Sequence, residues 1–109
     1  MKKILTATVA CVLGSAATAW AADAKSNWDD NCVKCHGADG KGGTKMGQHL
    51  HISDFTDAKV QAGFTDDQAF KAVKEGLKDQ DGKTRMKAIE GLSDDEITAL
   101  VKYVRGLKS

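Results

Sequence analysis

Apolar residues recur at helical spacing near the end of the chain. In the segment LSDDEITALVKYVRGLK, residues 92–108, they fall three or four positions apart, as on one face of a helix: Ile97, Leu100, Val101 and Val104. Ser93 and Glu96 have the spacing of a capping box, and Asp94 and Asp95 suit the positive start of a helix. The pattern predicts a helix that begins after Ser93.

A similar pattern predicts a second helix in the segment TDDQAFKAVKEGLK, residues 65–78. Thr65 and Gln68 form another capping-box pair. The apolar stripe behind them repeats at helical spacing at Phe70, Val73 and Leu77. We expect this helix to end near Leu77.

The remaining segments give one more helix and two long loops. A first helix is expected to be capped by Ser26, to carry Trp28 and to end at Gly37. The glycine-containing polar segments 37–55 and 78–91 are typical of loops. Since no segment shows the alternation of a strand, we predict an all-α protein with long loops.

The N-terminal segment MKKILTATVACVLGSAATAWAA has the order of a secretory signal: two lysines, an apolar run over 4–13, then small residues. A transmembrane anchor is the competing interpretation, but the run is about half of the roughly 20 residues that a span requires. We therefore predict a signal peptide over residues 1–21. Cleavage is expected after Ala21, with the bond after Ala22 as the alternative.

Removal of residues 1–21 leaves 88 residues of the 109, which is the size of one domain. Lys and Arg fall from 16 to 14 against 15 Asp and Glu, so the net charge becomes −1. This balance favours neither nucleic acid nor an anionic membrane as a partner. A domain this small has a small core, and a buried prosthetic group would complete it.

Cys32, Cys35 and His36 bring the candidate chemistry, because residues three and four apart share a helix face. The spacing C-x-x-C-H is the attachment signature of c-type haem, in which two thiols form thioethers and the histidine binds iron. Three alternatives remain at this point. They are a zinc site completed by His49 and His51, a thiol oxidoreductase, and a chance occurrence of the motif.

The ligand on the other side of the iron would decide the chemistry. Met46 and the loop histidines His49 and His51 follow His36 too closely to reach easily around a macrocycle. Met86 lies about 50 residues beyond His36, in a polar loop and away from any apolar stripe. We therefore favour Met86 as the distal ligand.

Two segments, CVKCHGADGKGG and RMKAIEGLSDDEITALVKYVRGL, resemble the class I cytochromes c, the small exported monohaem electron carriers of bacteria. The resemblance covers nearly the whole chain after the signal peptide. It implies a cytochrome c domain over residues 22–109, with three to five helices wrapped around one covalently bound haem. It also implies thioether attachment at Cys32 and Cys35, with His36 as proximal and Met86 as distal ligand of the haem iron.

The same resemblance implies a helix crossing, because in that family an aromatic residue of the first helix packs against one on the last. Trp28, preceded by the small Ala24, and Tyr103 occupy those places. Two prolines common in the family are replaced here. Gln48 stands where a proline carbonyl accepts the proximal histidine's N–H, and Lys87 stands after the distal methionine.

The function that the resemblance implies is that of a periplasmic one-electron carrier between redox proteins, without enzyme activity, membrane anchor or nucleic-acid partner. We expect a monomer. The alternative is a haem enzyme or sensor with a labile sixth ligand.

Overall fold

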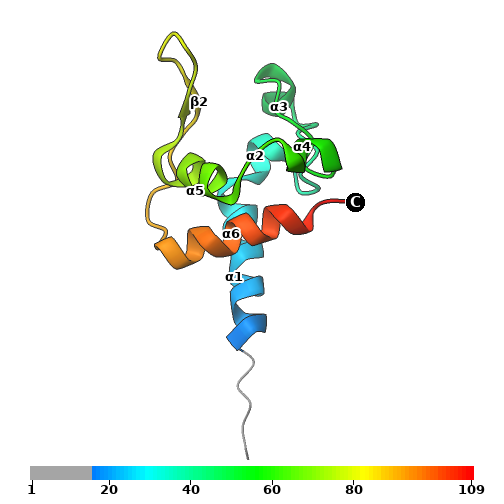
Figure 1. Ribbon diagram of the computed structural model, residues 1–109, viewed down its shortest axis with the longest axis vertical. Coiled ribbons are helices and arrows are strands. Elements are labelled where there is room, and N and C mark those ends of the chain that lie inside the picture. Colours follow the sequence, from blue (N-terminus) through cyan, green and yellow to red (C-terminus); the bar gives the residue numbers. More distant parts are fainter. Residues whose placement is uncertain (1–15) are drawn as a thin grey trace, which may run out of the picture.

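The computed structural model describes residues 16–109, and side-chain surroundings from residue 23 onward. These residues form six helices and one antiparallel pair of short strands (Figure 1). In chain order the elements are α1 (Ala16–Asn31), α2 (Val33–His36), α3 (Lys45–His49), α4 (Ala58–Ala62), α5 (Asp66–Glu75), β1 (Leu77–Lys78), β2 (Thr84–Met86) and α6 (Asp94–Gly106). The predicted all-α class is confirmed. Most of the predicted signal peptide, residues 1–15, lies outside the described residues.

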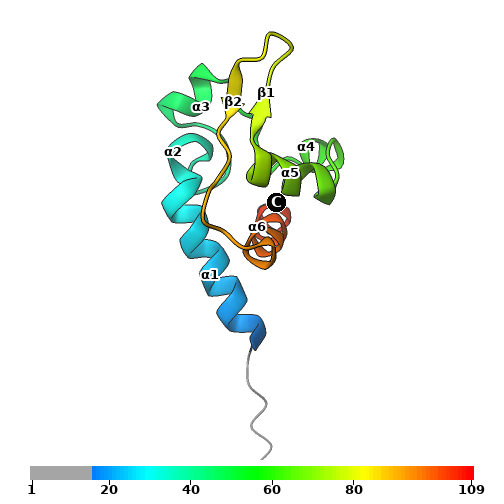
Figure 2. The same cartoon turned by 90° about the vertical axis from the view of Figure 1, so that its left-hand side faces the viewer.

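The core lies where α6 crosses α1 (Figures 1 and 2). The side chain of Trp28 is only 1% exposed and packs with Leu100, at 2%. The rings of Trp28 and Tyr103 lie 5.5 Å apart between centroids, and Ala24 is buried beside this crossing. The helix packing implied by the sequence resemblance is therefore confirmed.

The two helices predicted from capping boxes begin where expected, but α5 ends at Glu75, and Leu77, which was predicted on its apolar stripe, lies exposed in β1. Thr65 and Gln68 complete a reciprocal cap at the start of α5, and Ser93 and Glu96 complete another at the start of α6. Each box satisfies backbone N–H groups that have no partner within the helix. Local sequence alone therefore sets where these helices begin.

Other boundaries differ from the prediction. Ser26 is wrong as an N-cap, because it lies inside α1, whose described part already includes an alanine-rich stretch of high helix propensity before it. The helix is interrupted at Cys32, which separates α1 from α2. Gly37, with φ of 84°, ends α2 as predicted. None of the helices in residues 16–109 is long and apolar enough to span a membrane.

The predicted loops also contain regular structure. Thr44 caps α3 and Asp57 caps α4, each a helix of five residues. Leu77 pairs with Met86 across an irregular antiparallel hairpin, whose strands have two and three residues. Strands this short show no alternation in the sequence, so periodicity could not reveal them.

A polar contact joins the two crossed helices. Asn27 Nδ2 donates to Glu96 Oε2 at 3.3 Å, and Ser93 N donates to Glu96 Oε1 at 3.1 Å. Hydrogen bonds from the Ser93 backbone, and then from the Asn27 and Ser93 side chains, hold the pKa of Glu96 below its ordinary value. The ionised carboxylate therefore stabilises the fold above the unfolded-state pKa, and this stabilisation is lost as the pH falls.

We expect Glu96→Gln to be less stable than the parent at pH 7, with a smaller difference between the two proteins at pH 3. The variant keeps an acceptor for Ser93 N but has no charge to lose as the pH falls from about 5 toward 3. Denaturant midpoints of both proteins at the two pH values measure this. Glu90→Gln, at an exposed loop position, is the matched control. An equal midpoint difference at pH 7 and pH 3 would contradict the expectation.

Candidate functional site

The two cysteines and the histidine of the C-x-x-C-H motif lie in a single turn at the junction of α1 and α2. Cys32 N donates to Trp28 O at 2.8 Å, which continues the first helix. The next turn closes when His36 N donates to Cys32 O at 2.9 Å. Trp28 Nε1 donates to Gly37 O at 3.2 Å and so ties this turn to the core. The structure thus brings together the three residues predicted from the motif.

Among the described residues, the thiols of Cys32 and Cys35 are free and are not joined to each other in a disulfide. Cys32 is buried, and burial, followed by the nearby Cys35, raises the pKa of the Cys32 thiol to about 11. Thiol oxidoreductases need a cysteine of lowered pKa, and their motif follows a strand. Here a helix precedes a neutral thiol, so the oxidoreductase alternative is disfavoured.

The side chain of His36 packs against two aromatic rings and is partly shielded from solvent. Its ring lies 5.1 Å from Phe55 and 5.6 Å from Trp28 between centroids. Burial lowers the pKa of His36, so the imidazole is neutral at pH 7, which is the form that binds metals. A neutral imidazole with two free thiols in the same turn fits the requirements of haem c.

The Nδ1 atom of His36 is buried and has no hydrogen-bond partner within residues 16–109. The resemblance placed the carbonyl of Gln48 where a proline carbonyl would accept from this atom. In the structure, Gln48 O instead accepts from the backbone N–H groups of Leu50 and His51. His51 adopts φ of 54°, which places the chain in the left-handed region at this turn.

The loop after the motif is held without proline. Thr44 Oγ1 donates to Cys35 O at 2.6 Å and accepts from Gly47 N at 2.9 Å. A Cβ on Gly47 would collide with the carbonyl oxygens of Cys35 and Gly42. Only glycine therefore allows α3 to pack this closely against the turn that contains the motif.

Met86 lies on a separate element, at the end of β2, and is half-buried. From β2, Arg85 Nη2 donates to Leu50 O, and just beyond the hairpin Ile89 N donates to Val73 O at 2.8 Å. In Figures 1 and 2, α3 and the hairpin extend toward the same end of the molecule, and Figure 1 shows them on opposite sides above α2. Arg85 thus links the strand of Met86 to the end of α3.

The alternative ligands lie on the surface. Met46 is 41% exposed, and His49 and His51 are exposed as well. Met46 and His49 line a surface pocket of about 360 Å³ together with Lys34 and Lys45. Within residues 16–109, neither His49 nor His51 joins Cys32, Cys35 and His36 in a group that could hold a zinc ion. A zinc site needs such a group, so this alternative is disfavoured.

Comparisons with known proteins find similarity to c-type cytochromes. The model of the cytochrome c family matches residues 21–108. The solved structure of the KustC0563 c-type cytochrome is similar, with a TM-score of 0.68 and 32% identity over 80% of this chain and 99% of that one. A mutant of that cytochrome, with one tyrosine changed to phenylalanine, gives a TM-score of 0.65 at 32% identity, over 79% and 99% of the two chains. The search of curated proteins found no significant match.

Proposed function

Since the chain belongs to the cytochrome c family, we propose that it is a one-electron carrier whose haem iron is bound by His36 on one side and Met86 on the other. Covalently bound haem c is the cofactor of this family, and haem-based electron transfer is its general function. The haem supplies one reversible electron-accepting centre. Cys32 and Cys35 are the proposed attachment sites.

One observation carries the proposal: two free thiols and a neutral, half-buried histidine occupy one turn. His36 needs no proton release before it binds iron at pH 7, because burial keeps the ring neutral. Trp28 and Phe55 pack against the ring and shield part of it from water. Arg85 attaches β2 to the end of α3, and Met86 is the next residue of that strand. This attachment supports Met86 as the second ligand.

We also propose export to the periplasm, cleavage after Ala21 or Ala22, and action as a monomer between redox protein partners. Cytochrome c domains are typically exported, and the family match begins at residue 21, beside the proposed cleavage site. Covalent attachment would keep the cofactor on a carrier after its export to the periplasm. The mass of the secreted protein and its size in solution test these points.

The decisive experiment is a spectroelectrochemical titration of the purified holoprotein. We expect a single reversible one-electron transition, and no binding of carbon monoxide to the reduced protein at pH 7, because a firmly bound methionine closes the iron. Carbon monoxide binding to the reduced protein would instead support a haem enzyme or sensor with a labile sixth ligand.

Replacing the cysteines tests the attachment. We expect the double change Cys32→Ala with Cys35→Ala to abolish haem that survives denaturation and acid–acetone extraction, because both thioethers are lost. Each single variant should keep one thioether and retain the haem. Haem staining of denatured protein and intact mass measure the result. Retention of covalent haem in the double variant would overturn the assignment of both sites.

A further inference from the structure

The imidazole of His36 lacks the hydrogen bond that usually orients a metal-binding histidine. Such histidines generally donate their second ring N–H to a carbonyl, carboxylate or water, which fixes the ring plane. Nδ1 of His36 is buried and has no such partner among the residues that the structure describes. Another contact must therefore set the orientation of the ring.

Phe55 supplies that contact. Its ring lies nearly parallel to the His36 ring, with 21° between the planes and 5.1 Å between the centroids. Turning the imidazole about its Cβ–Cγ bond would drive its edge toward the phenyl face, so the stacked arrangement restricts this rotation. The Trp28 ring is tilted by 39° to the His36 ring, so it lies less parallel to the imidazole than the Phe55 ring does.

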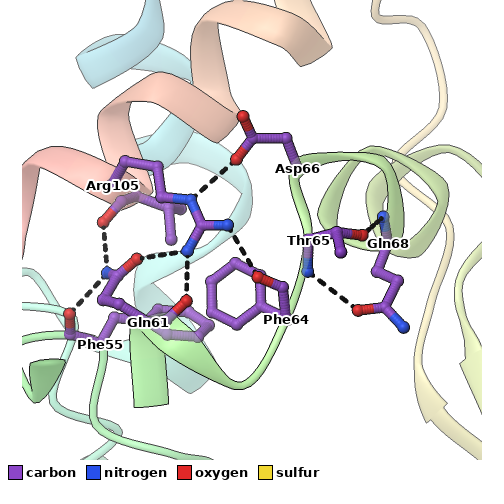
Figure 3. A network of polar contacts seen from close by, with 8 residues as sticks. Phe55, Gln61, Phe64, Thr65, Asp66, Gln68 and Arg105 are labelled. Atoms are coloured by element: carbon purple, nitrogen blue, oxygen red, sulfur yellow. Dashed lines mark hydrogen bonds and ion pairs between the residues drawn. The ribbon is translucent and has the colours of Figure 1, made fainter. Parts of the chain in front are cut away.

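Phe55 is held by a buried glutamine. Gln61 is 6% exposed, and its Nε2 donates to Phe55 O at 2.7 Å and to Val104 O at 2.8 Å (Figure 3). Its Oε1 accepts from Arg105 Nη1 at 3.0 Å. Both hydrogens of the amide are therefore used to join the Phe55 backbone to α6.

Arg105 secures the glutamine in turn. Its guanidinium donates to the carbonyls of Gln61 and Phe64 and to Asp66 Oδ1, the last at 2.8 Å (Figure 3). The same group lies 4.3 Å from the centroid of the Phe64 ring, which meets Phe55 edge-on at 5.8 Å. A planar group with several fixed donors can hold this segment in a way that a lysine ammonium cannot.

We propose that Phe55 is the positioning residue for His36, and that Gln61 and Arg105 keep its ring in the stacked position. The inference rests on the proposed role of His36 as an iron ligand. It assigns a function to a polar network more than 20 residues along the chain from the motif. The stacked ring replaces the hydrogen bond that His36 Nδ1 lacks.

The first test is Phe55→Leu, which keeps an apolar side chain and removes the flat ring. The paramagnetic shifts of the haem methyl protons in the oxidised protein depend on the plane of the axial imidazole. We therefore expect these shifts to be redistributed, and the g-values of the low-spin ferric signal to change. Phe55→Tyr retains the ring and should keep both spectra of the parent.

The second test acts without touching His36. Gln61→Met is similar in size but lacks the two donors to Phe55 O and Val104 O, and Arg105→Lys lacks the planar group. We expect each to shift the haem methyl pattern in the same direction as Phe55→Leu. Combined with Phe55→Leu, Gln61→Met should add little further shift, since the glutamine acts through the phenyl ring.

A matched core change separates positioning from a general loss of stability. Ile97→Val removes one methylene from a side chain that is 1% exposed on α6, so it should lower stability and leave the haem methyl pattern unchanged. If Phe55→Leu and Gln61→Met both keep the parent pattern, the positioning role is overturned while the proposed function stands. If the spectrum of the parent protein shows that no histidine binds the haem iron, both the positioning role and the proposed function are overturned.

Discussion

Met86→Ala is expected to abolish the weak far-red absorption band that reports sulfur bound to ferric haem iron. Loss of the thioether should also lower the reduction potential, because a methionine ligand favours the reduced iron. Axial ligands span roughly 0.8 V in haem proteins, and we expect a sizeable part of that range to be lost. The reduced variant should bind carbon monoxide at pH 7.

Met46→Ala is the matched control, since Met46 is the other methionine in the described residues and lies on the surface. It should keep both the band and the potential of the parent. Retention of the band in Met86→Ala would contradict the assignment of Met86 as the distal iron ligand. Its loss in Met46→Ala alone would move the sixth ligand to α3.

Trp28→Ala is expected to reduce the free energy of unfolding of the holoprotein by about 3–5 kcal/mol, as for other large aromatic residues removed from cores. The indole is 1% exposed, packs on Tyr103 and donates to Gly37 O, so its removal opens a cavity where α1 crosses α6. In a domain of this size each kcal/mol lowers the melting temperature by roughly 4–8 °C.

Thermal and denaturant unfolding of the holoprotein measure this loss. Trp28→Phe keeps an aromatic ring between the helices and should lose less than half as much stability. A loss below about 1 kcal/mol in Trp28→Ala would mean that the helix crossing does not depend on this residue, against the burial seen in the structure.

The elements that could be predicted are those determined by local sequence. The capping boxes at Thr65 and Ser93 involve residues three positions apart, and the apolar stripe behind each cap spans a few turns, so both starts were correct. The short helix α3 was missed because its glycine, Gly47, has low helix propensity and is explained only by close packing against Cys35.

The same distinction applies to the site. Cys32, Cys35 and His36 are adjacent in sequence, so their spacing alone brought them together. The stacking of Phe55 on His36 joins residues 19 positions apart, and the bond from Arg105 to Gln61 spans 44 positions. No periodicity relates such residues, and the absence of an acceptor for His36 Nδ1 becomes visible only once the surrounding backbone is in place.

The crossing of α1 and α6 also has a kinetic consequence. The contact between Asn27 and Glu96 joins positions 69 residues apart, so docking these helices closes most of the domain into one loop. For a flexible chain the length-dependent part of that closure costs about 4 kcal/mol. In the proposed ligation, His36 and Met86 bind the same iron and divide this loop into shorter ones. We therefore expect the covalent cofactor to speed folding, and the chain without it to find its last contact slowly.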